Sequence, residues 1–108
     1  MTLLFNTSFH ISSSIESEFK RWAQDEYLPA VDRSGLFKAP TILKVLTARD
    51  SEEGETFCIQ MFSSKPREAM KWLDEEAPKV RNSLINRYDA ERVLHFTSSM
   101  LVVGEKED

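Results

Sequence analysis

Hydrophobic and polar residues alternate in several segments of the chain, and this alternation predicts β-strands. Between Thr2 and Ile11 the odd positions include Leu3, Phe5 and Phe9, while the even positions are mixed. A period of two is typical of a strand that lays one face on a core. The same reasoning predicts strands over residues 39–48, 56–62 and 93–103.

The segment after the first strand has a helical period instead. Its apolar residues recur on one helical face. Ser13 followed by Glu16 fits a capping box at the start of this helix. Pro29 disfavours the α conformation at Leu28 and predicts a kink or break there, and Gly35 suits the end of the segment. The face comprises Ile15, Phe19, Trp22, Ala23 and Tyr27.

A second helix is predicted after the third strand. Ser63, Ser64 and Pro66 precede an apolar stripe with spacings of three and four, which is the period of a buried helix face. Pro78 lies inside the stripe, so we expect the helix to bend or restart at Ala77. The stripe is Ala69, Leu73, Ala77, Val80, Leu84 and Tyr88.

The resulting order, β-α-β-β-α-β, predicts an α+β fold, the ferredoxin-like plait. Right-handed crossovers place the four antiparallel strands in the order four-one-three-two, with both helices on one face. The polar segment 50–54 is the expected loop of the central hairpin. We expect one domain over residues 1–104, followed by a charged fringe at 105–108.

The second sheet face is left uncovered by two helices. If Phe5, Phe9, Phe57, Ile59 and Met61 face the helices, the alternate residues form an open face that is half apolar. Such a face predicts a homodimer, with two sheets closing on each other around a partly wet interior. The open-face set is Leu4, Asn6, Ser8, His10, Cys58, Gln60 and Phe62.

Composition narrows the function classes. The chain has 108 residues and a net charge of −4, and the predicted open face carries no Lys or Arg, so nucleic-acid binding is not expected. Cys58 is the sole cysteine, and no signal segment or membrane-length apolar run is present, so we expect a cytoplasmic protein away from membranes. The three glycines are far apart, which excludes glycine-rich phosphate loops, and no cofactor is expected.

Two histidines are candidates for chemistry. His10 closes the first strand and His95 opens the last, and these strands are expected to be antiparallel neighbours. A register that sets them opposite one another would create a cross-strand pair able to titrate near neutral pH. The alternative is two half-buried edge histidines bonded to backbone or water. A metal site is not expected, because no third ligand shares the neighbourhood.

Candidate ligand-binding residues come from both layers. Asn6, Ser8 and Gln60 are polar residues of the predicted central strands, and a buried Asn6 amide requires a partner in Gln60 or a ligand. The large aromatic residues with polar groups are also candidates, although ordinary core packing explains their spacing equally well. These are Trp22, Tyr27 and Trp72.

Three groups of residues together resemble a bacterial family, the domain of unknown function DUF4286, found mostly in Bacteroidetes. The resemblance covers nearly the whole chain and implies a dimeric α+β barrel, a superfamily that includes cofactor-independent monooxygenases and isomerases. This chain departs from it at Tyr27, Glu76 and Leu84, where relatives carry histidine. The matching groups are Leu4-Phe5-Asn6-Thr7-Ser8, Trp22 through Pro29 to Gly35-Leu36-Phe37, and Glu75-Glu76-Ala77-Pro78 with Arg87-Tyr88 and Phe96.

Three functions remain open at this point. The first is a homodimer that binds a small organic molecule between sheet and helices. The second is a cofactor-independent monooxygenase or isomerase with His10 or His95 as base and Asn6 and Tyr27 positioning the substrate. The third is an interaction module without a pocket. A pocket of a few hundred Å³ lined by Asn6, Gln60 and aromatic residues would separate the first two from the third.

Overall fold

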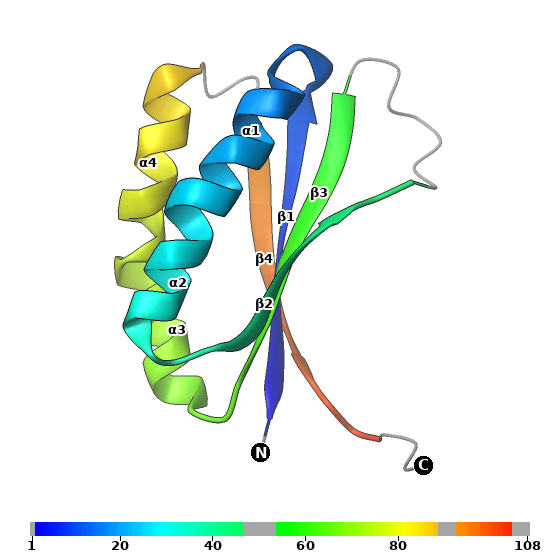
Figure 1. Cartoon of the computed structure of the whole chain (residues 1–108). Coiled ribbons are helices and arrows are strands. Elements are labelled where there is room, and N and C mark those ends of the chain that lie inside the picture. The colour runs from blue at the N-terminus through cyan, green and yellow to red at the C-terminus, as the bar shows by residue number, and fades with distance from the viewer. Residues whose placement is uncertain (1, 47–53, 89–92, 105–108) are drawn as a thin grey trace.

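The computed structural model has the predicted ferredoxin-like arrangement, one helical layer on one face of a four-stranded antiparallel sheet (Figure 1). It describes residues 2–46, 54–88 and 93–104; the predicted fringe at 105–108 and the hairpin loop before Gly54 lie outside that range. The elements are β1 (Leu3–Ser12), η1 (Ser13–Ile15), α1 (Glu16–Trp22), η2 (Ala23–Tyr27), α2 (Leu28–Ser34), β2 (Lys38–Lys44), β3 (Gly54–Ser63), α3 (Pro66–Glu75), α4 (Ala77–Arg87) and β4 (Val93–Leu101).

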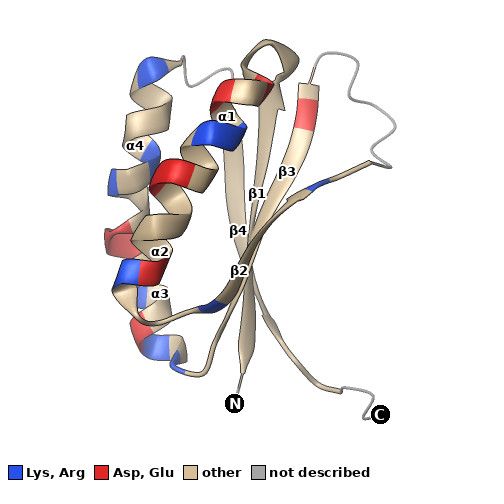
Figure 2. Ribbon diagram, viewed as in Figure 1, with Lys and Arg blue, Asp and Glu red and all other residues tan. Residues whose placement is uncertain are grey.

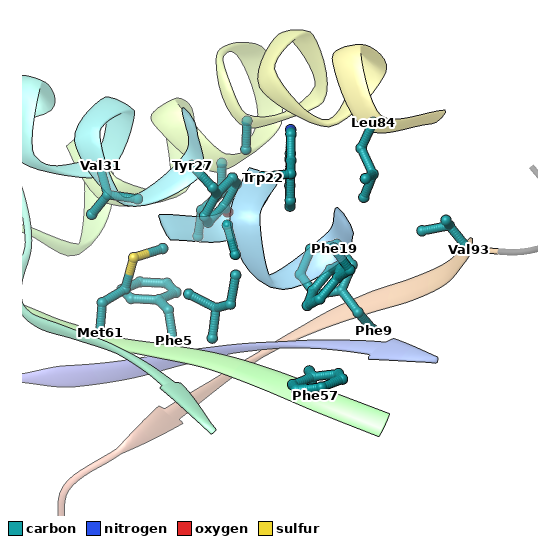
Figure 3. Close-up of a cluster of buried hydrophobic side chains, with 14 of the residues drawn as sticks. Phe5, Phe9, Phe19, Trp22, Tyr27, Val31, Phe57, Met61, Leu84 and Val93 are labelled. Carbon is teal, nitrogen blue, oxygen red and sulfur yellow. The ribbon is translucent and has the colours of Figure 1, made fainter. Parts of the chain in front are cut away.

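The strand order β2-β3-β1-β4 confirms the predicted topology. In the register, Phe5 pairs with Met61 and Phe9 with Phe57, so these four side chains share the helix-facing side. Figure 3 shows this layer, with the side chains of β1 and β3 meeting those of the helices. Burying each such aromatic ring stabilises the fold by about 1.5–3 kcal/mol.

The start of the first helix differs from the prediction. Neither of the first two helical segments has a side-chain cap among the described contacts, so the predicted Ser13–Glu16 capping box is not formed. The chain instead enters through the short 3-10 turn η1, and the Ser12 and Ser14 hydroxyls bond each other at 2.9 Å. Glu16 turns outward to Lys44 of β2, 2.9 Å away.

The predicted interruption at Pro29 takes the form of a wider helical turn. Residues Ala23–Tyr27 form a π-helix, in which the amide of Leu28 donates to the carbonyl of Ala23, five residues earlier. Pro29 then lies in the first turn of α2, where its missing amide is tolerated. The helical path therefore continues to Gly35, which closes it with a left-handed φ of 68°.

The second helix restarts where Pro78 predicts it. α3 begins at Pro66, with the Ser63 hydroxyl accepting the amide of Lys65 at 3.0 Å, and ends at Glu75. α4 begins at Ala77 with Pro78 in its first turn. Among the described residues, no helix is long and apolar enough to cross a membrane.

Candidate functional site

A cavity of about 300 Å³ lies between the edge strand β4 and the helices α3 and α4. The apolar residues that line it are Phe5, Met70, Leu73 and Phe96. This volume is at the lower end of the range for small-molecule sites. The polar side chains that line it are Asp74 of α3, Arg81 of α4, and His95, Thr97 and Ser99 of β4.

The cavity exists because β4 has small or polar side chains where the sheet meets the helices. β4 pairs with β1 so that His95 lies beside Phe9, Thr97 beside Thr7 and Ser99 beside Phe5. Side chains across a pair point to the same face, so these three β4 residues face the helical layer. None is large and apolar enough to fill the space against α3 and α4.

Two threonine hydroxyls form a hydrogen bond between β1 and β4 beside the cavity. The Thr7 and Thr97 hydroxyl oxygens lie 2.9 Å apart, and Thr7 is almost fully buried on the central strand β1. Thr97 continues into the lining of the cavity. A polar contact therefore runs from the buried Thr7 of the central strand to Thr97 in the cavity lining.

Tyr27 is fully buried near Arg81, and its hydroxyl has no hydrogen-bond partner among the described residues. Burial raises the pKa of this phenol above its ordinary value of 10, and the nearby Arg81 guanidinium and Thr7 hydroxyl oppose that rise. Both groups are close enough to influence the phenol, but neither meets the geometry of a hydrogen bond. Tyr27 is therefore a neutral, unpaired donor at neutral pH.

His95 is also held in its neutral form. Partial removal from water lowers the pKa of its imidazole below the ordinary value of 6.5, and the positive charge of Arg81 lowers it further. The ring keeps one side open to solvent and packs against Phe9, with ring centroids 6.1 Å apart. A neutral imidazole has a free lone pair, which is what a general base requires.

The two histidines do not form a pair. The register places His10 opposite Leu94 and His95 opposite Phe9, so the rings point to opposite faces of the sheet. His10 instead bonds the Thr56 hydroxyl at 3.1 Å on the open face. Its ring also lies over Gly54, where an added Cβ would come within 2.7 Å of it.

The predicted ligand-binding residues are divided between the two faces. Asn6, Ser8 and Gln60 lie on the open face, away from the cavity, with Asn6 donating to the Ser8 hydroxyl at 3.2 Å. The Asn6 side-chain oxygen is buried without a partner within the described part of the chain. Asn6 and Gln60 are register neighbours, but no hydrogen bond between their side chains is present among the described contacts.

The two tryptophans lie outside the cavity lining. Trp22 is buried and donates its indole N–H to the Ser83 hydroxyl at 2.9 Å, so its polar group is already occupied. Trp72 packs against Phe37 and Tyr27 from α3 and borders two outer surface hollows. Both pack in the core or at its rim, which is the alternative that their spacing left open.

Sequence reasoning did not identify Thr7, Asp74, Arg81, Thr97 and Ser99. A signal for the β4 residues exists in the alternation of that strand. Leu94, Phe96 and Met100 fall on the open face, while the helix-facing positions between Val93 and Leu101 are His95, Thr97 and Ser99, the reverse of the pattern in β1. No comparable signal marks Arg81, which lies among many charged residues of the second helix (Figure 2).

Metal chemistry has no evident set of ligands here. Across the described ranges, no three His, Cys, Asp or Glu side chains gather closely enough to hold a metal ion. The polar groups at the cavity are a guanidinium, hydroxyls, one imidazole and one exposed carboxylate. These groups suit hydrogen bonding and proton transfer.

Comparison with known proteins gives the family and the fold. The chain matches the model of the domain of unknown function DUF4286 over residues 2–103 and belongs to that family. It matches no curated protein sequence.

Solved structures share the fold at low sequence identity. A dimeric ferredoxin-like protein from an uncultured marine organism has a TM-score of 0.67 and 13% identity, covering 97% of this chain and 98% of the other. The heme-degrader MhuD of Mycobacterium tuberculosis, with two hemes in its active site, has a TM-score of 0.63 and 15% sequence identity. The match covers 97% of this chain and 99% of MhuD. A mutant of SnoaB, a cofactor-independent oxygenase from Streptomyces nogalater, has a TM-score of 0.61 and 13% sequence identity. The match covers 99% of this chain and 98% of SnoaB.

Proposed function

We propose that this member of the DUF4286 family is a homodimer that binds a small organic molecule in the cavity beside β4 of each protomer. The carrying observation is the cavity of about 300 Å³ on which Arg81 and His95 converge. A chain acting only as an interaction module would have no need of such a space. The lining differs from the one predicted, because it includes neither Asn6 nor Gln60.

Filling the cavity tests this proposal. N-phenyl-1-naphthylamine is a neutral aromatic probe whose fluorescence rises in apolar sites. Ser99→Trp places a large ring in the cavity, and we expect it to abolish saturable probe binding. Gln24→Trp is the matched control, since Gln24 is exposed on η2 and lies outside both the cavity lining and the open face; it should keep the probe site. Equal binding by all three proteins would refute the proposed site.

The homodimer is supported by the open face of the sheet. Its residues on β1, β3 and β4 carry no Lys, Arg, Asp or Glu, whereas charges crowd the helical layer (Figure 2). Leu94 is 59% exposed and Phe96 65% exposed on this face. Apart from Lys38 of β2, which pairs with Phe62, this face is uncharged, and an uncharged surface with large exposed apolar groups is typical of an interaction site.

A charge placed on the open face tests the dimer. In Leu94→Lys an ammonium group would be buried between two sheets, at an effective penalty of several kcal/mol, so we expect a monomer. Gln24→Lys adds the same charge to the exposed surface of η2 and should leave a dimer. Light scattering across micromolar concentrations distinguishes them. A monomeric wild type would refute this part.

A cofactor-independent oxygenase or isomerase is the second candidate, favoured by the position of His95 beside Arg81 in the lining of the cavity. Its imidazole would take a proton from a carbon acid, and the Arg81 guanidinium would stabilise the resulting anion. The test is deuterium uptake from D₂O into 1,3-diketones, together with oxygen consumption. We expect His95→Gln to lose activity and His10→Gln, on the other face, to keep it; the reverse would exclude His95 as base.

The single cysteine, Cys58, is relevant to the cellular compartment in which the protein works. It is a free thiol, half-buried on β3, and its sulfur lies 3.7 Å from the Ser8 hydroxyl. A single cysteine, which cannot form an intramolecular disulfide, supports the proposal that the protein works in the reducing bacterial cytoplasm.

A further inference from the structure

Arg81 is a half-buried cation without a counter-charge in the described structure. Its guanidinium lines the cavity from α4, and no described carboxylate lies within ion-pair distance of it. Arg87, six residues further along α4, pairs with Glu26 at 3.3 Å on the outer surface. A guanidinium drawn partly out of water without a partner is unfavourable, and a bound anion would correct this.

The groups around Arg81 also favour an anion. The Thr97 and Ser99 hydroxyls line the same cavity as Arg81. Hydroxyls and a guanidinium can all donate hydrogen bonds, and an arginine fork matches the two oxygens of a carboxylate or sulfonate. Against this stands one carboxylate, Asp74, which lines the cavity from α3 but is exposed to water.

We propose that the cavity selects organic anions, with a carboxylate or sulfonate on Arg81 and an apolar, ring-sized body against Phe5, Met70 and Leu73. This rests on the proposed function, because it assigns a ligand class to the same cavity. The apolar wall accounts for the body of the ligand, and the donors account for its charge. A neutral ligand of the same shape would leave the guanidinium unpaired and bind more weakly.

The proposal also fixes the pH dependence of binding. The charged groups facing His95 are Arg81 on α4 and Asp74 on α3, and its neighbour on β1 is the uncharged Phe9. A bound anion would favour the imidazolium, so it would raise the pKa of His95 from its lowered value. By linkage, anion binding then tightens as the pH falls through that range. A neutral ligand would show no such tightening.

Two probes that differ by one charged group test the selection. 8-Anilinonaphthalene-1-sulfonate carries a sulfonate, and N-phenyl-1-naphthylamine has the same ring skeleton without it. We expect Arg81→Gln to weaken sulfonate binding about tenfold or more, equivalent to about 1.4 kcal/mol, and to change neutral-probe binding less than about twofold. Arg67→Gln, on the exposed part of α3 outside the cavity lining, is the matched control and should change neither.

Asp74 supplies a test of opposite sign. Asp74→Asn removes the negative charge from the cavity wall, so sulfonate affinity should rise while neutral-probe affinity stays the same. Because Asp74 is exposed, this variant remains informative even if Arg81→Gln does not fold. Sulfonate affinity that is unchanged or reduced in Asp74→Asn would overturn the inference.

The outcomes separate this inference from the function on which it rests. If Ser99→Trp blocks the neutral probe but the charge variants leave the sulfonate unaffected, the cavity binds ligands without selecting anions, and the inference alone is wrong. If Ser99→Trp blocks neither probe, both bind elsewhere and the proposed function is wrong as well. Blocking of both probes, with opposite effects of Arg81→Gln and Asp74→Asn on the sulfonate only, supports both.

Discussion

Replacing Tyr27 by phenylalanine removes one buried oxygen and leaves the rest of the core in place. The Tyr27 ring packs against Trp22 at 5.3 Å, Trp72 at 6.2 Å and Phe9 at 6.4 Å between centroids, and phenylalanine keeps all three contacts. The hydroxyl has no hydrogen-bond partner among the described residues. The substitution therefore removes an unsatisfied polar group from a fully buried site.

The size of the effect follows from the penalty for such a group. A buried donor without a partner destabilises a fold by about 1–3 kcal/mol. Thr7 and Arg81 lie close enough to offset part of this penalty, so we expect the lower end of the range. Tyr27→Phe should raise the unfolding free energy of the ligand-free protein by about 1 kcal/mol, and its Tm by about 4 °C.

Urea unfolding followed by circular dichroism measures this change. Neutral pH is suitable, because the pKa of Tyr27 lies above 10 and the phenol is uncharged there. Ser83→Ala is the control of opposite sign, since it removes the acceptor at 2.9 Å from the Trp22 indole and leaves a buried donor unpaired. It should lower stability by about 1–3 kcal/mol. A Tyr27→Phe protein less stable than wild type by 1 kcal/mol or more would refute the reasoning.

Three further predictions concern stability. Gly54→Ala should destabilise the fold by about 1–3 kcal/mol in urea unfolding, because the new Cβ would lie 2.7 Å from the Ile11 carbonyl oxygen, and backbone cannot yield as a side chain can; an unchanged midpoint would contradict it. Ala39→Gly should stabilise by about 1 kcal/mol in the same assay, because Ala39 holds a strained φ of 53°; a loss of stability would count against it. Since the pKa of His95 is lowered in the folded state, the unfolded chain binds its proton more readily, and stability should fall as the pH drops below 6.5. His95→Gln should reduce that slope in urea unfolding between about pH 7 and pH 5, and an unaltered slope would refute this attribution.

The faces of the sheet could be predicted because β1 and β3 differ so clearly from side to side. Phe5 and Phe9 alternate with Asn6 and Ser8, so one register alone buries the aromatic residues. Right-handed crossovers then leave one strand order for two β-α-β units. Local pattern and chain geometry were sufficient for the topology.

The relation between the histidines could not be predicted from the same patterns. A shift of one residue in the register between β1 and β4 decides whether His10 and His95 share a face. Both strands tolerate polar residues near these positions, so the sequence holds no strong preference. Only the pairing of His95 with Phe9 settles the question.

The proposed ligand cavity could not be predicted for a related reason. In the middle of the edge strand β4 the apolar residues Leu94, Phe96 and Met100 lie on the open face, so Thr97 and Ser99 resemble ordinary solvent-facing positions. The π-helix of η2 could not be predicted either, because such a helix has no sequence period of its own. Pro29 indicates that the helix is interrupted but does not specify the kind of interruption. The location of Tyr27 near Arg81 depends on helix packing, which local periodicity does not encode.

Methionine methyl NMR tests the central claim that the ligand site and the dimer surface lie on opposite faces of one sheet. Met70 lines the cavity and Met100 lies on the open face, and each is 43% exposed, so they are matched reporters. With ¹³C-methyl methionine, the neutral naphthylamine probe should shift the Met70 resonance and leave Met100 in place. Dilution through the dimer dissociation range should shift Met100 and leave Met70. Probe-induced shifts confined to Met100, or dilution shifts confined to Met70, would contradict the account.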